Sequence, residues 1–252
     1  MNMTNNLIEY IYGIADNDLI LGQRLGELCG HGPNIETDIA LTNISLDLFG
    51  QVRSFYQYVA SLQGANANED TVAFLRKEFE YKNVLLVEQP NTDFGYVIAR
   101  QFLFDVFNHL LIGRLQDSKD ETLSAIAKKG FKEVSYHVRF SSDWIRRLGD
   151  GTAESHQRIQ TAINDLWVYT EELFQQTDAD KAMIALGIGV DVTHFKADYF
   201  KRVSEILTEA TLQTPDSQYF QKGGKQGNHT EHMGFILTEM QYMQRTYPNM
   251  TW

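Results

Sequence analysis

The sequence predicts an all-α protein built as a four-helix bundle with additional helices and an extended C-terminal arm. Apolar residues recur in steps of three and four through long segments, only four prolines interrupt the 252 residues, and two pairs of such segments resemble each other. With 43% apolar residues and no low-complexity linker, we expect one domain over residues 1–252. Within it the bundle occupies residues 1–211 and the arm residues 212–252.

The first half contains two long predicted helices, over residues 5–28 and 36–62, each followed by glycine. A shorter helix over residues 69–88, ended by Pro90, crosses to the second half. Such a long connection is typical of ferritin-like bundles.

The second half repeats this arrangement with two long predicted helices. The first is capped by Asn91 or Thr92 and runs to about residue 116, and the second covers residues 119–147. A cap at Thr152 starts a helix that reaches about residue 175. Shorter helices are predicted over residues 178–186, 193–211 and 230–246.

Residues 132–137 nearly spell Glu-x-x-His, the motif that places iron ligands on inward helix faces of di-iron bundles. Val134 takes the place of the glutamate, whereas His137 is present. On the earlier apolar stripe Leu48 and Gln51 occupy the corresponding positions, so both metal-binding residues are missing there.

An aspartate lies on an apolar face at almost the same distance before each pair. Asp18 precedes Leu48 by 30 residues and Asp105 precedes Val134 by 29, so the chain is interpreted as two similar helix pairs. We expect Asp18, Asp105 and His137 to lie near one another in the interior without a metal. The missing bridging carboxylates are what would hold two hard cations together.

Other candidate sites have simpler explanations. We expect Glu133 to lie beside the inward stripe and to make a salt bridge or a helix contact. Asp105 and His109, which are four residues apart, are explained by an inter-helix hydrogen bond. The sequence from His229 to His232 matches no zinc motif, and residues 222–227 lack the spacing of a phosphate-binding loop.

Composition excludes several classes of function. A net charge of −11 disfavours binding to nucleic acid or an anionic membrane. The single cysteine, Cys29, excludes an intrachain disulfide, and neither a signal pattern nor a run of 18 apolar residues occurs. We therefore expect a cytoplasmic protein.

Several segments resemble the PaaC family, the structural subunits of the bacterial phenylacetyl-CoA 1,2-epoxidase (phenylacetate-CoA oxygenase). The resemblance covers nearly the whole chain and is carried by residues 25–31, 47–51, 86–91, 132–137 and 223–242. It implies a ferritin-like fold and a non-catalytic role in aerobic phenylacetate degradation. The catalytic relative's six ligand positions fall on Asp18, Leu48, Gln51, Asp105, Val134 and His137.

The resemblance also implies partners. A homologous catalytic subunit, in a heterodimer or higher assembly, would carry the di-iron centre, a reductase would carry FAD and an iron–sulfur centre, and a small bridging subunit would join them. No cofactor is expected in this chain. The alternative is an independent metal-dependent ferritin-like oxidase that uses Asp18, Asp105, Glu133 and His137.

The tail is the predicted partner-binding element. Lys222, Lys225, His229, Glu231 and His232 are its candidate contact residues. The arm before the last helix is too polar to order itself, so we expect it to be held by the bundle or by another chain. We also expect a bundle lacking residues 221–252 to remain folded.

Overall fold

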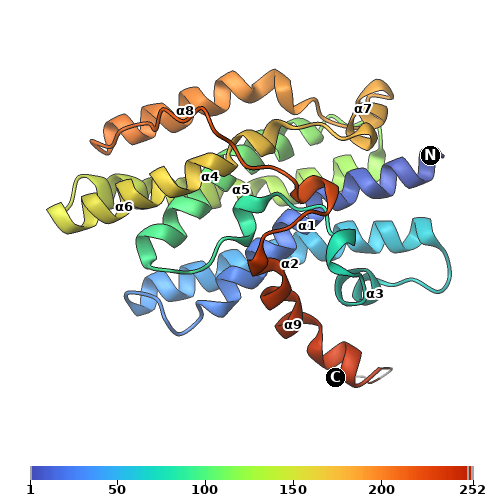
Figure 1. The fold of residues 1–252 in the computed structure, drawn as a ribbon. Helices are drawn as coiled ribbons and strands as arrows, with labels where there is room; N and C mark the ends of the chain where they lie inside the picture. Colours follow the sequence, from blue (N-terminus) through green and yellow to red (C-terminus); the bar gives the residue numbers. More distant parts are fainter. Residues whose placement is uncertain (1, 249, 251–252) are drawn as a thin grey trace. The chain divides into compact units, whose positions relative to one another are not determined.

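The computed structural model describes residues 2–248 and 250, and in this part of the chain all regular structure is helical, which confirms the predicted all-α class (Figure 1). The α-helices are α1 (Met3–Glu27), α2 (Ile35–Gln63), α3 (Glu69–Phe74), α4 (Phe94–Leu115), α5 (Glu121–Gly149), α6 (Ala153–Leu166), α7 (Asp178–Ala185), α8 (Lys196–Glu209) and α9 (Glu231–Thr246). Short 3-10 turns are η1 (Glu78–Glu80), η2 (Leu85–Glu88), η3 (Trp167–Tyr169), η4 (Glu171–Phe174), η5 (Val192–Phe195) and η6 (Gly224–Gln226). None of these helices is long and apolar enough to cross a membrane.

The chain separates into two compact units. The first comprises Met1–Glu88, Thr177–Ala179 and Gly223–Trp252, and the second comprises Gln89–Gln176 and Asp180–Lys222. Each unit contains one of the two predicted long helix pairs, because α1 packs on α2 in the first and α4 packs on α5 in the second. The single-domain assignment stays a prediction.

In the first unit, α1 and α2 approach closely at Gly22. A side chain there would meet the ring of Phe49 at 2.9 Å, and the hydroxyl of Ser45 donates to the carbonyl oxygen of Gly22 at 2.8 Å. The small residue lets the two helices contact, and the serine satisfies its hydrogen bond internally. Asn34 caps α2 by accepting from the backbone N–H of Thr37 at 2.9 Å.

In the second unit, α4 is the central helix. Its sequence is apolar on almost every face, the pattern expected of a helix surrounded by protein. It contacts α5, α6 and α8. Thr152 caps α6 as predicted, accepting from the backbone N–H of Ser155 at 3.1 Å.

The connection after α2 differs from the predicted helix over residues 69–88. Only α3 is α-helical there, and the chain continues through η1, an extended stretch and η2. The reason lies in α1, where Asp16 accepts from the backbone N–H of Lys82 at 2.7 Å and Asn17 from that of Val84 at 2.8 Å. These side chains occupy backbone donors that a continuous helix would need.

Asp16 also anchors the guanidinium of Arg76. Two guanidinium nitrogens of Arg76 donate to the two carboxylate oxygens of Asp16, at 2.6 and 2.9 Å. The hydroxyl of Tyr56 donates to the same carboxylate at 2.5 Å. The guanidinium carbon lies 4.2 Å from the ring centre of Tyr12 and 4.1 Å from that of Tyr81. All polar groups of this buried pair therefore have partners.

Two further boundaries differ from the sequence prediction. The cap of α4 is Asp93, which accepts from the backbone N–H of Tyr96 at 2.8 Å, whereas Asn91 accepts from the side chain of Arg100. The helix predicted to reach residue 175 leaves the α conformation after Leu166 and continues as η3 and η4.

The predicted arm is held by its own chain. The backbone N–H of Gln213 donates to the side chain of Gln160 at 2.7 Å, and that of Gln221 donates to the carbonyl oxygen of Val168 at 2.8 Å. Both contacts lie in the second unit. Such hydrogen bonds supply the order that a polar segment cannot obtain from burial.

The Asp16–Arg76 pair gives a stability prediction. Asp16→Asn removes the charge but keeps the shape, and leaves the Arg76 guanidinium buried without its counter-charge. We expect unfolding in urea to show a loss of about 3 kcal/mol. Asp143→Asn is the matched control, because Asp143 pairs with Arg146 on the surface, where a pair contributes less than about 1 kcal/mol. Equal losses in both variants would contradict the assigned role of Asp16.

Candidate functional site

The six predicted ligand positions all lie on the long helices and are buried. Asp18 on α1 and Leu48 and Gln51 on α2 belong to the first unit, and Asp105 on α4 and Val134 and His137 on α5 belong to the second. The stripes predicted from the sequence are therefore the buried faces of these helices. That Asp18 lies near Asp105 and His137 remains a prediction.

In the second unit, Asp105 and His137 form a buried polar cluster. The side-chain amide of Gln101 donates to Asp105 at 2.7 Å. Burial raises the pKa of Asp105 to about 6, although the charge of His137 and the hydrogen bonds of Ser141 and Gln101 act to lower it. A carboxyl group with a pKa of about 6 gains and loses its proton close to neutral pH. Its hydrogen bonds allow it to remain buried in the core.

The cluster is poor in metal ligands. Within the described part of either unit, no three His, Cys, Asp or Glu side chains gather closely enough to hold a metal ion. Glu133 is only half-buried, next to the fully buried Val134. The nearby His109 accepts from Arg202 of α8 at 3.2 Å, an inter-helix hydrogen bond of the expected kind.

The predicted partner-binding tail docks at a second buried site, which is centred on Glu88 of η2. One oxygen of this fully buried carboxylate accepts from Asn83 at 2.9 Å and lies 2.6 Å from Nδ1 of His229. The other accepts from the backbone N–H of Thr230 at 2.8 Å and from its hydroxyl at 2.6 Å. This carboxylate therefore fixes the start of α9.

The second ring nitrogen of His229 lies 3.0 Å from the carbonyl oxygen of Tyr81. Both ring nitrogens thus face oxygen acceptors, an arrangement that suits the doubly protonated imidazolium. Burial alone would lower the pKa of His229, but the hydrogen bond and charge of Glu88 outweigh it, so the pKa is raised.

The contacts of His229 and Gln241 bear on two expectations about the tail, namely which residues contact a partner and whether the bundle needs the tail. The imidazole of His229 is enclosed in its own chain, with no exposed side-chain surface, so it is not an external contact residue. The side chain of Gln241 on α9 also donates to the carbonyl oxygen of Arg76 and to the hydroxyl of Tyr81. Residues 223–246 therefore contribute to the core of the first unit, and the folding of a chain without residues 221–252 stays a prediction.

The glycines of residues 223–227 serve close packing. A side chain on Gly224 would lie 2.2 Å from the carbonyl oxygen of Asn83, and one on Gly227 would lie 2.1 Å from that of Phe79. Gly227 also has a left-handed backbone with φ of 82°. The segment is a close-packed turn on its own unit.

Asp16, Arg76 and Glu88 are structural anchors that were not predicted from the sequence. A usable signal was present for Asp16, because three consecutive polar residues, Asp16 to Asp18, interrupt a largely apolar helical segment. For Arg76 and Glu88 no local pattern shows that their partners lie 60 and 141 residues away.

The raised pKa of His229 predicts a pH-dependent stability. Its contribution is fully present below the unfolded pKa of about 6.5 and is lost as the pH rises through the higher folded pKa. We expect His229→Gln to lower the melting temperature most at about pH 6, with a smaller difference from the wild type in alkaline buffer.

His232→Gln is the matched control for this experiment, because His232 lies three residues along, on the half-exposed side of α9. It should follow the wild type at every pH. A deficit for His229→Gln that stays constant or widens with rising pH would contradict the charged state of His229.

Comparison with known proteins identifies the family. A model of the family described as phenylacetic acid catabolic protein, covering PaaA and PaaC proteins, matches residues 1–252. The chain is also 48% identical over 248 residues, 98% of its length and 100% of the relative's, to the PaaC subunit of the 1,2-phenylacetyl-CoA epoxidase of Escherichia coli (strain K12). These matches confirm the resemblance seen in the sequence segments: the chain belongs to the PaaA/PaaC family of phenylacetic acid catabolic proteins.

Proposed function

We propose that this chain is the non-catalytic structural subunit of a multicomponent phenylacetyl-CoA monooxygenase. In this role it adopts a ferritin-like bundle, pairs with a homologous di-iron catalytic subunit and stabilises it. The relative is named as one subunit of an epoxidase, and this name and the end-to-end match support membership in such a complex. The small bridging subunit and the FAD and iron–sulfur reductase are its further proposed partners.

The observation that carries the non-catalytic role is the pair Leu48 and Val134. Each is 1% exposed and stands where a di-iron bundle needs a ligand carboxylate. An aliphatic side chain donates no electron pair to iron, and here it fills space in the core. Gln51 stands at a histidine position of the motif, and its amide oxygen suits iron less well than an imidazole nitrogen does. The remaining Asp105 and His137 offer one carboxyl and one imidazole in the second unit.

The alternative function is an independent metal-dependent oxidase using Asp18, Asp105, Glu133 and His137. The half-buried position of Glu133 weighs against it, because the inward stripe of α5 passes through the buried Val134 and Glu133 lies on its flank, although His137 is a neighbour of Glu133 at spacing four. A carboxylate on the flank of the helix is poorly placed to replace one on the inward stripe.

Metal analysis of the purified chain separates the two functions. We expect substoichiometric iron after expression in iron-supplemented medium, and recovery of the catalytic subunit when the two chains are expressed together. A stoichiometric pair of irons in the isolated chain would establish the oxidase alternative. Absence of the catalytic subunit from the purified material would contradict the proposal that the two chains pair.

The outer face of α9 is the best-supported contact surface for that partner. Phe235 and Tyr242, two turns apart, are 71% and 57% exposed, and Met243 beside them is 41% exposed. Among the candidate contact residues, Lys222 and Glu231 are exposed and Lys225 and His232 are half-buried. Apolar side chains within a charged rim are common in protein interfaces.

We expect the double substitution Phe235→Asp and Tyr242→Asp to reduce co-purification with the catalytic subunit at least about tenfold, because both aromatic anchors are lost. Circular dichroism should remain that of the wild type, since both side chains point to solvent. The matched control is Ile39→Asp with Leu46→Asp, an exposed pair with the same spacing on α2. Loss of co-purification in the control variant alone would show that the partner contacts α2 instead of α9.

A further inference from the structure

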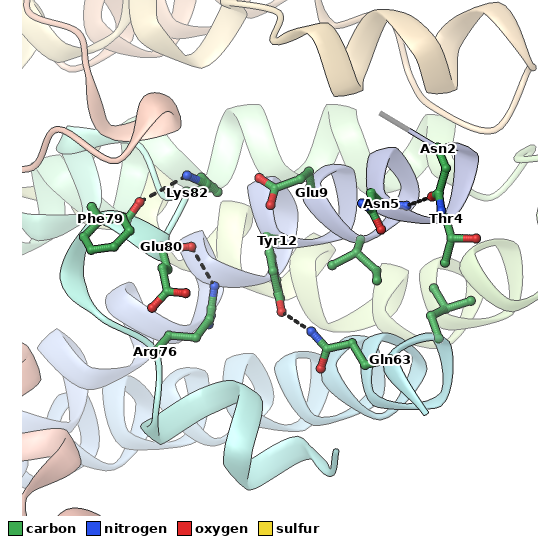
Figure 2. A pocket seen from close by; sticks show the side chains of 12 residues that line it. Asn2, Thr4, Asn5, Glu9, Tyr12, Gln63, Arg76, Phe79, Glu80 and Lys82 are labelled. Carbon is green, nitrogen blue, oxygen red and sulfur yellow. Dashed lines mark hydrogen bonds between the residues drawn. The ribbon is translucent and has the colours of Figure 1, made fainter. Parts of the chain in front are cut away.

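A pocket of about 810 Å3 opens in the first unit, between the N-terminal part of α1, the end of α2 and the segment from Arg76 to Lys82. Figure 2 shows Glu9 and Tyr12 projecting from α1 in the middle of this pocket, with Arg76, Glu80 and Lys82 on one side and Gln63 on the other. Every lining residue belongs to the first unit, so the pocket is a property of that unit.

Glu9 is the chemically unusual group in this pocket. Its side chain is half-buried, yet among residues 2–248 and 250 it has no hydrogen-bond or ion-pair partner. Burial raises the pKa of Glu9, and the more distant charges of Lys82 and Arg76 offset this only in part. A carboxylate that is partly desolvated without a contacting cation is stabilised when a cation reaches it.

Tyr12 supplies a second unused group. This side chain is 6% exposed, and its hydroxyl accepts from the side-chain amide of Gln63 at 2.9 Å. Its own proton has no acceptor in the described part of the chain. Since a buried hydroxyl normally donates as well as accepts, the pocket offers a hydrogen bond to an incoming carbonyl oxygen.

The charge around the pocket favours a cation. Arg76 is neutralised by Asp16 at 2.6 Å, so among the described lining residues two carboxylates, those of Glu9 and Glu80, remain against one ammonium, that of Lys82. The ring of Phe79 is 59% exposed at the rim and offers a face for stacking. A planar guanidinium bonds a carboxylate through two N–H groups and stacks on an aromatic ring, whereas an ammonium does neither as well.

We propose that this pocket binds an arginine side chain presented by another polypeptide, with its guanidinium on Glu9 and Phe79 and its backbone carbonyl oxygen accepting from Tyr12. A free small guanidinium could satisfy Glu9 but would leave the Tyr12 donor unused. The net charge of −11 makes this acidic protein a complementary surface for a basic segment. The inference does not depend on which protein supplies the arginine, and so stands apart from the proposed function.

Calorimetric titration of the full chain with a capped Gly-Arg-Gly peptide tests the proposal. The matched probe is the same peptide with citrulline, which keeps the shape of arginine but lacks its charge. We expect binding of the arginine peptide only. Glu9→Gln should weaken it at least about tenfold, the loss of one charged hydrogen-bonded contact. Glu36→Gln, an exposed glutamate outside the pocket, should leave binding unchanged.

Two variants of the lining test the details, with circular dichroism as the folding control. Lys82→Gln should strengthen binding, because it removes a competing positive charge. Tyr12→Phe should weaken binding of the peptide but not of agmatine, which has a guanidinium and no carbonyl group. Equal binding of the arginine and citrulline peptides, or no binding of the arginine peptide at millimolar concentration, would overturn the proposal. Agmatine binding as tightly as the peptide would overturn the polypeptide part of it.

Discussion

The first unit depends on one buried carboxylate, that of Asp16. This group is 0% exposed and holds three parts of the chain at once, through Tyr56 of α2, the guanidinium of Arg76 and the backbone of Lys82. A buried charge of this kind is tolerated only when every acceptor site is used, and removing one partner leaves the others unbalanced. The path of residues 76–84 is therefore set by side chains of α1.

Glu88 plays the corresponding role for the tail. Its carboxylate binds His229 and Thr230, and its backbone carbonyl oxygen accepts two hydrogen bonds from Arg24 of α1, at 3.0 and 2.7 Å. Asp16 and Glu88 together bracket the segment that replaced the predicted crossing helix. Tyr81 connects the two anchors, because its ring stacks on Arg76 while its carbonyl oxygen meets His229. The segment is thus irregular but highly constrained, and α9 docks on it.

The long helices could be predicted from the sequence because the periodicity of apolar residues reports burial directly. The stripes through Leu48 and Val134 are the buried faces of α2 and α5. The same reasoning failed for residues 75–88, where Phe79 is exposed and Glu88 is buried, the reverse of their hydropathy. There the conformation follows from partners distant in sequence, such as Asp16 and His229, which local patterns do not encode. The identity of the tail as a core element was missed for the same reason.

The buried aliphatic residues Leu48 and Val134 have an energetic consequence for the folded chain. A di-iron site without metal leaves several buried ionisable groups, each destabilising until a cation arrives. Leu48 and Val134 are buried apolar side chains, so their burial stabilises the folded chain without any counter-ion. Asp105 is a buried group that does carry this cost, because burial raises its pKa to about 6 despite the hydrogen bond from Gln101.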